Sequence, residues 1–204
     1  RTGQFISATT FGSQTDAQRL IERVRAIHLK VTGHAPDGRP YAAYDPDLLT
    51  WVHVAEVSSF LKAHLRYLNP ALPGQEQDRY YSEVARIAEA LGAHHVPHSR
   101  QEVDDYLKAI RPQLLRDERS REIARILFDA PAPSRLAKPF GALMMRAGVD
   151  LLPDWASDML DLSQSERQRQ LIRMAVRRTA PVLRWAVRSG SVHRARRRVG
   201  LPIR

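Results

Sequence analysis

The segment from Asp45 to Leu68 constrains the fold more than any other part of the chain, because it carries the pattern of a long amphipathic helix. Asp45-Pro46 is a typical helix start, since an aspartate accepts hydrogen bonds from the first backbone amides and proline is tolerated at the first helical position. Beyond it, apolar side chains recur at spacings of three and four, which is the helical period. They are Leu48, Leu49, Val52, Val57, Phe60, Leu61 and Leu65. His53 lies between Leu49 and Val57 in this spacing, so it is predicted to point at the core.

The other periodic segments are helical too. A helix with a wide apolar face is predicted from Thr15 to Gly33, and a Ser99-x-x-Glu102 capping box starts another. Further helices are expected at about 1–10, 75–92, 117–128, 135–149 and 164–188. Residues 33–45 are rich in Gly, Pro and Asp and are expected to form a loop.

No segment shows the alternating pattern of a strand, and no internal repeat is present. The sequence therefore predicts one all-α, multi-helix globular domain over residues 1–204. The helices that begin near Thr15 and Asp45 have the widest apolar faces, so they are expected to pack against each other.

Composition limits the chemistry of the chain. Its 204 residues are 43% hydrophobic, which suits a single domain with its own core. The absence of cysteine excludes disulfides, thiolate-ligated haem, cysteine-ligated zinc and iron–sulfur clusters, and covalent c-type haem. No apolar run reaches the length of about 18 residues that a membrane-spanning helix needs. A cytoplasmic location is expected, with peripheral attachment to a membrane as a further option.

The chain lacks an initiator Met, and residues 1–6 have the pattern of a helix entered midway. We therefore expect N-terminal sequence to be missing, together with any targeting signal that it carried.

The net charge of +10 is concentrated at one end. Residues 167–204 contain 12 Arg and no Asp or Glu, whereas the rest of the chain is near neutral. Apolar residues between the arginines suggest a basic amphipathic helix followed by a basic tail at 189–204. An anionic membrane surface would suit this arm. Nucleic-acid binding is less favoured, because no recognised module or aromatic platform accompanies the charge, and a solvated face is the simplest alternative.

The common enzymatic signatures are absent, including the glycine-rich phosphate loop, the dinucleotide fingerprint and the His-Glu-x-x-His zinc motif. Two histidines on apolar helix faces remain as candidates, His28 and His53. A haem iron needs a neutral imidazole on a stiff element surrounded by apolar side chains. A core histidine that is hydrogen-bonded to a carbonyl or carboxylate would give the same spacing, and for His53 the nearby Glu56 could be that partner.

Four sequence motifs resemble the superfamily of the rubber oxygenases (latex clearing proteins), which includes the oxygenase of mycophenolic acid biosynthesis and many uncharacterised bacterial proteins. They are Ile27-His28, Tyr41-x-Ala-Tyr-Asp45-Pro-x-Leu-Leu-x-Trp51-Val-His53, Asp78-Arg79-Tyr80-Tyr81-x-Glu83 and Leu151-Leu152-Pro153-x-Trp155. The resemblance spans nearly the whole chain and is closest to the uncharacterised bacterial branch. It implies an all-α fold and a b-type haem held by one histidine.

The resemblance places His28 at the position of the iron ligand and Thr2 on the helix that lines the other haem face. Arg1 stands where rubber-cleaving members have a distal lysine. A guanidinium stays protonated and is a poor iron ligand, so Arg1 is expected to pair with a haem propionate or to polarise dioxygen. His53 is a further cofactor-binding candidate, with less support. The catalytic glutamate of the family belongs upstream of residue 1, so no catalytic residue is assigned.

Two functions follow as hypotheses. The first is a haem-b-dependent oxygenase that acts on an apolar small molecule or polymer. The second is a non-catalytic helical protein that binds haem or uses its basic C-terminal arm at a membrane surface.

Overall fold

The computed structural model describes most of the chain. The described residues are 2–35, 37–129, 134–135, 138–186 and 190–202. For residues 183–186 only the backbone is described.

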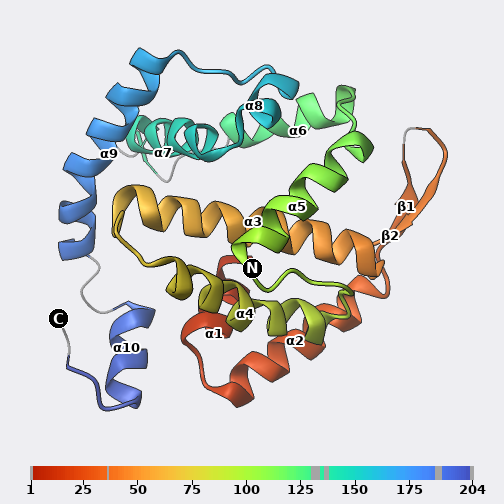
Figure 1. Ribbon diagram of the computed structural model, residues 1–204, viewed down its shortest axis with the longest axis horizontal. Helices are drawn as coiled ribbons and strands as arrows, with labels where there is room; N and C mark the ends of the chain where they lie inside the picture. Colours follow the sequence, from red (N-terminus) through yellow and green to blue (C-terminus); the bar gives the residue numbers. More distant parts are fainter. Residues whose placement is uncertain (1, 36, 130–133, 136–137, 187–189, 203–204) are drawn as a thin grey trace. The chain divides into compact units, whose positions relative to one another are not determined.

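Helices make up most of the described structure (Figure 1). They are α1 (Thr2–Phe11), α2 (Gln14–His28), α3 (Pro46–Tyr67), α4 (Gly74–Leu91), α5 (Arg100–Ile110), the 3-10 turn η1 (Arg111–Gln113), α6 (Glu118–Phe128), α7 (Lys138–Leu151), α8 (Asp154–Met159), α9 (Glu166–Ala186) and α10 (Ser191–Arg198). The all-α class predicted from the sequence is confirmed, and most helix boundaries lie within a few residues of those expected.

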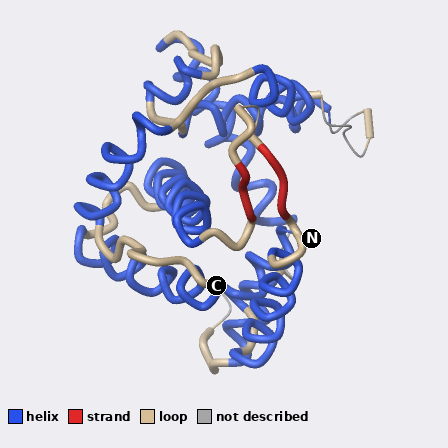
Figure 2. The backbone as a smooth tube through the Cα atoms, turned by 90° about the vertical axis from the view of Figure 1, so that its right-hand side faces the viewer, coloured by secondary structure: helices blue, strands red, loops and turns tan. Residues whose placement is uncertain are grey.

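A short β-hairpin lies in the segment that was expected to be a loop. Strand β1 (Thr32–His34) pairs antiparallel with β2 (Pro40–Ala42), and the two strands run side by side in Figure 2. Each strand has three residues and too few side chains to show an alternating pattern, which explains why the sequence did not reveal it. The hairpin connects the end of α2 to the start of α3.

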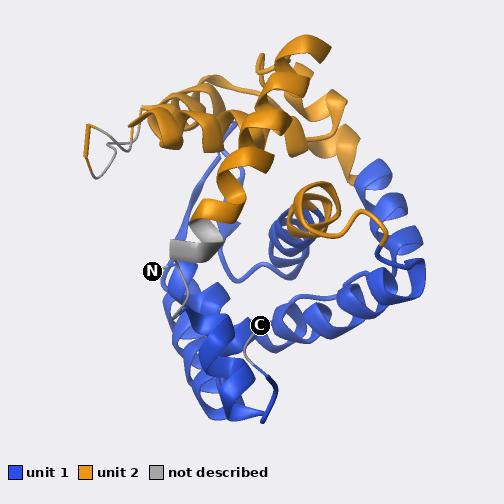
Figure 3. Cartoon of the chain, turned by 90° about the vertical axis from the view of Figure 1, so that its left-hand side faces the viewer, with its two compact units in different colours: residues 1–58, 72–109, 187–204 blue, residues 59–71, 110–186 orange. Residues whose placement is uncertain are grey.

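The chain divides into two compact units, shown in different colours in Figure 3. Unit 1 contains residues 1–58, 72–109 and 187–204, and unit 2 contains residues 59–71 and 110–186. Each unit is assembled from segments that are distant in the sequence, so neither corresponds to one continuous stretch of chain.

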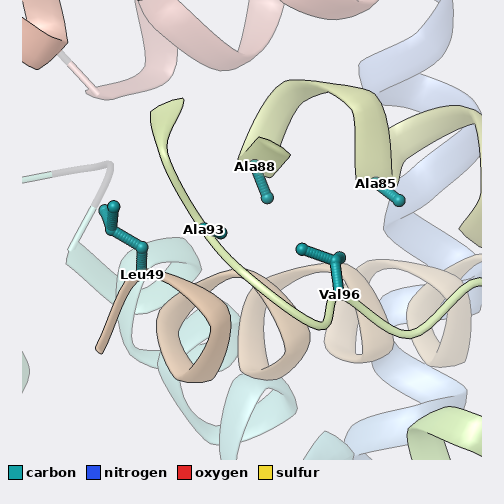
Figure 4. Close-up of a cluster of buried hydrophobic side chains, with 5 residues drawn as sticks. All are labelled: Leu49, Ala85, Ala88, Ala93 and Val96. Carbon is teal, nitrogen blue, oxygen red and sulfur yellow. The ribbon is translucent and has the colours of Figure 1, made fainter. Parts of the chain in front are cut away.

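The core of unit 1 contains a cluster of small and medium apolar side chains around α4. Leu49 of α3 packs with Ala85 and Ala88 of α4 and with Ala93 and Val96 of the loop that follows (Figure 4). The small alanine side chains allow the helices to approach closely.

A buried threonine also holds α3 to the loop after α4. The Thr50 hydroxyl is 2.7 Å from the carbonyl oxygen of His94 and 2.9 Å from that of Pro46, and the residue is only 2% exposed.

The helices that begin near Thr15 and Asp45 were expected to pack against each other, but the closest neighbours of α2 within the described structure are α1 and α4. Two apolar residues of α3 assigned to the core are largely exposed, Val52 at 55% and Phe60 at 44%. Val54, which the spacing had not singled out, is 1% exposed. The buried face of α3 is therefore rotated relative to the expected one.

In unit 2, α7 packs along α9. Their contact contains Ala147, Ile172 and Val176, with Tyr67, Leu143 and Met144 at its edge. No helix within the described residues is long and apolar enough to cross a bilayer.

The C-terminal segment 189–204, expected as a basic tail, contains the helix α10. α10 packs against α1 within unit 1. The Ser7 and Ser191 hydroxyl oxygens are 2.8 Å apart, and an Arg198 guanidinium nitrogen donates to the Phe11 carbonyl at 3.0 Å. The end of the arm is thus a packed helix over these residues.

Candidate functional site

His28 is the last residue of α2, and its position is set by that helix. Ser13 caps the helix start by accepting a hydrogen bond from the Asp16 amide. Ile21, on the apolar face seven residues before His28, is buried. The His28 ring is half-buried, and its Nδ1 atom is buried without a hydrogen-bond partner among the described residues.

Exposed apolar residues flank His28 on both sides in the sequence. Ile27, Leu29 and Val31 are 49%, 65% and 42% exposed. Val31 lies within the helix predicted from Thr15 to Gly33, but α2 ends at His28 and the chain then turns into the hairpin. The chain next to His28 therefore exposes apolar side chains to solvent.

The hairpin and the turn after it carry two more exposed aromatic residues, Tyr41 and Tyr44. The Ala43 amide donates to the Val31 carbonyl at 2.9 Å, which holds the residues before Tyr44 beside the end of α2. Tyr41 lies opposite Gly33 in the hairpin, and a Cβ atom on Gly33 would lie 2.8 Å from the Tyr41 ring. Tyr41 and Tyr44 are 47% and 48% exposed.

His53 lies on α3, which begins as predicted. The Asp45 side chain accepts hydrogen bonds from the amides of Asp47 and Leu48, at 2.9 and 3.1 Å. The His53 Nε2 atom is buried and has no hydrogen-bond partner among the described residues. Burial lowers the pKa of His53 to about 4, against a smaller opposing effect of Glu89, so this imidazole is neutral near pH 7.

The carboxylate that acts electrostatically on His53 is Glu89 of α4, whereas Glu56 was the partner considered from the sequence. Glu89 also contacts His98, with 3.0 Å between its Oε1 and the His98 Nε2. Glu56 lies one helical turn after His53, is half-buried, and has its pKa raised by burial. The unpaired nitrogen of His53 is therefore not explained by a bond to Glu56.

The remaining predicted site residues are less constrained. Thr2 is the first residue of α1 and is exposed. Arg1 lies outside the described residues. No hydrogen bond links Thr2, His28 and His53 to one another within the described structure, and no group of three or more His, Asp or Glu side chains converges there as a metal site. The two histidines share one property, a buried ring nitrogen without a partner.

Residues of the third motif shape the scaffold of unit 1. The carboxylate of Asp78 accepts hydrogen bonds from the backbone amide and the guanidinium of Arg100, both at 2.9 Å, which ties α4 to the start of α5. The Tyr80 hydroxyl donates to the Val57 carbonyl of α3 at 3.2 Å. Their role here is to fix the helices that carry His53 and Glu89.

The sequence did not indicate the charged cluster beside the fourth motif. Asp150 is 1% exposed and pairs with Arg66 of α3 and Arg173 of α9 in unit 2. Next to it, the Lys62 ammonium donates to the Leu152 carbonyl at 3.2 Å, and the guanidinium carbon of Arg111 lies 5.4 Å from the centre of the Trp155 ring. These partners are far apart in the sequence, so no local motif signals them.

Comparison with known proteins identifies the family to which this chain is similar. The family described as ER-bound oxygenase mpaB/B'/Rubber oxygenase, catalytic domain, matches residues 1–185. Two uncharacterized proteins, one of Mycobacterium bovis and one of Mycobacterium tuberculosis, are each 28% identical over 176 residues, which cover 82% of this chain and 68% of the relative. No solved structure matches significantly.

Proposed function

Because the chain belongs to the catalytic-domain family of ER-bound mpaB/B' and rubber oxygenases, we propose that it is a haem-b-dependent oxygenase acting on an apolar substrate, with His28 as the axial ligand. The family match covers all four motifs of the sequence resemblance. The family match supports an oxygenase. The haem, its histidine ligand and the substrate class are proposed in addition.

The observation that carries the proposal is the family match over residues 1–185. It is joined by the Nδ1 atom of His28, which is buried without a hydrogen-bond partner among the described residues, as are one ring nitrogen of His53 and one of His193. A buried polar atom without a partner costs free energy, so such atoms are uncommon in folded proteins. An imidazole with a nitrogen free of hydrogen bonds, at the end of a stable helix, has the chemistry that a haem iron requires. The chain has no cysteine, so a thiolate cannot take that role.

The surroundings of His28 suit an apolar ligand. Ile27, Leu29 and Val31 lie within three positions of His28 and are exposed. Tyr41 and Tyr44, in the hairpin segment that follows, are exposed as well. Covering them with a porphyrin or an apolar substrate would remove their surface from water, which contributes roughly 25 cal/mol per Å² buried. This arrangement favours a hydrophobic substrate over a charged one.

The other predicted residues would assist His28. When bound, haem b supplies the capacity to activate dioxygen. His53 is neutral near pH 7, so it offers a buried proton acceptor. The Thr2 hydroxyl is available to donate a hydrogen bond, and Arg1 would balance a propionate charge or polarise dioxygen. His28 holds and orients the cofactor in this account.

The test begins with haem binding and continues to turnover. The chain is titrated with haemin, and a Soret band that saturates at one haem per chain is expected. Reduced, haem-loaded protein is then incubated with oligo-isoprenes under ¹⁸O₂, and mass spectrometry should detect ¹⁸O in the products. Absence of any stoichiometric Soret change would contradict the cofactor assignment.

A second candidate is a haem protein without oxygenase activity. It is favoured by one observation, that no residue of the chain could be assigned as the catalytic base from its motifs. Stoichiometric haem binding through His28, without ¹⁸O incorporation into oligo-isoprenes or other apolar alkenes, would support this alternative over the oxygenase.

A further inference from the structure

Helix α9 of unit 2 has two apolar faces, and only one of them is buried. The inward face carries Ile172 and Val176, which are 7% and 8% exposed and pack against α7. This contact accounts for the amphipathic pattern that anchors α9 to its unit.

The opposite face is exposed although it carries large apolar side chains. Leu171, Met174 and Val182 are 65%, 48% and 63% exposed. Arg167 lies four residues before Leu171, and Arg178 lies four after Met174 and four before Val182. At 3.6 residues per turn, these five side chains form one stripe along the helix, which we call the outer stripe of α9.

The arginines on the other side of α9 are already engaged. Arg169 pairs with Asp154 at 2.9 Å, and Arg173 pairs with Asp150 at 2.8 Å. In contrast, Arg167 and Arg178 are exposed and form no ion pair with any described residue. The outer stripe contains no acidic residue. Two uncompensated positive charges thus alternate with three exposed apolar side chains.

We propose that the outer stripe of α9 docks on an anionic membrane surface. A helix that lies in the interface inserts apolar side chains at the headgroup level while arginines contact anionic lipids. The outer stripe has both the exposed apolar side chains and the arginines that this requires. A face that only contacts water would not need the apolar side chains. This inference concerns a surface in unit 2 and does not depend on haem binding by His28.

The sequence suggested that the whole basic arm binds a membrane, whereas the structure favours one helix of it, α9. α10 carries much of the remaining positive charge, but it packs on α1 in unit 1. α6 also exposes apolar side chains, yet Glu118 and Glu122 accompany its arginines. The outer stripe of α9 combines exposed apolar side chains with positive charge and no acidic residue, which is the charge complementarity that anionic lipid requires.

The first test is co-sedimentation of the full chain with vesicles at low salt. Binding is expected to phosphatidylcholine vesicles that contain 30% phosphatidylglycerol, a composition chosen for this assay, and not to pure phosphatidylcholine. Arg167→Gln/Arg178→Gln should lower the partition coefficient about 25-fold, because each basic residue near an anionic surface contributes about fivefold. Leu171→Ser/Met174→Ser/Val182→Ser should lower it by at least about tenfold through lost apolar burial.

Matched controls are placed on exposed residues of the same unit. Arg125→Gln/Arg146→Gln removes the same charge from α6 and α7, and Ile123→Ser/Ile126→Ser/Leu127→Ser removes comparable apolar surface from α6. Both should bind as the parent does. Circular dichroism and thermal unfolding must show that each variant is folded, which is expected because every substituted side chain is exposed.

A second test reports insertion directly. The chain has no cysteine, so Met174→Cys and the control Ile126→Cys can each be labelled at one site with an environment-sensitive fluorophore. A blue shift on adding anionic vesicles is expected at position 174 and not at position 126.

Several results would overturn the proposal. They are equal binding to neutral and anionic vesicles, no binding to either, or full binding by the outer-stripe variants. Self-association of the chain that the serine variant abolishes would identify a second copy as the occupant. Binding of a DNA duplex that depends on Arg167 and Arg178 but not on the apolar side chains would identify nucleic acid.

Discussion

The carboxylate of Asp150 accepts two hydrogen bonds from the guanidinium of Arg173, at 2.9 Å from Nε and 2.8 Å from Nη2. Arg66 adds a third bond at 2.7 Å, and the Asp150 side chain is completely buried. The three residues come from α7, α9 and α3. This cluster joins α7, α9 and the C-terminal part of α3 within unit 2 through one buried charge. The pairing of that charge is necessary for it to be tolerated.

Asp150→Ala is expected to destabilise the protein by about 3 kcal/mol, because it leaves two partly buried guanidinium groups without their partner. The control is Asp105→Ala, which breaks the exposed pair with Lys108 and should have a much smaller effect on stability. Urea unfolding followed by circular dichroism measures both. Equal small effects would show that the cluster contributes little.

His53 should make the stability of the haem-free chain depend on pH. Its pKa is lowered to about 4 by burial, against 6.5 for an unperturbed imidazole, so the unfolded chain binds the proton more tightly. Stability is therefore fully present above about pH 6.5 and is lost as pH falls toward 4. The loss is roughly 2 kcal/mol after allowance for the partial exposure of the ring.

The measurement is the free energy of unfolding at pH 7 and pH 4 for the parent and for His53→Gln. The parent should lose about 2 kcal/mol more than the variant over this interval, because glutamine does not titrate. Identical pH profiles would mean that the His53 ring is solvated or paired.

Gly92 ends α4 in the left-handed conformation, with φ of 107° and ψ of 13°. A Cβ atom there would contact only Leu49 Cδ1 at 3.9 Å, so the cost of Gly92→Ala comes from the backbone and should be about 1–2 kcal/mol. Gly141→Ala is the control, since it lies within α7 with no atom within 4 Å of its Cβ position. That change should be neutral or stabilise by up to about 1 kcal/mol. Thermal unfolding of the two variants distinguishes them.

The sequence predicted the features that depend on neighbouring residues. The Asp45 cap of α3 forms as expected. At the start of α5, the Ser99 hydroxyl oxygen accepts from the Glu102 amide, while the Glu102 carboxylate accepts from the amide of His98 instead of that of Ser99. Such contacts are encoded within four residues, so a pattern can reveal them.

Features that depend on distant residues could not be predicted in this way. Asp150 meets Arg66 across 84 positions, and no local spacing records that contact. The rotation of the buried face of α3 toward Val54 follows from the packing partners of the helix, which the apolar period alone does not specify. The sequence indicated His28 through its place on an apolar helix face and through the family resemblance, whereas its buried, unpaired nitrogen became visible only in the folded chain.

Haem ligation by His28 is tested most directly by a haemin titration of the parent, His28→Ala and His53→Ala, followed at the Soret band. His28→Ala is expected to lose stoichiometric binding and His53→Ala to be weakened less, and imidazole added to His28→Gly is expected to restore the band. Circular dichroism confirms that each variant is folded. A full Soret band in folded His28→Ala, without added imidazole, would contradict the assignment.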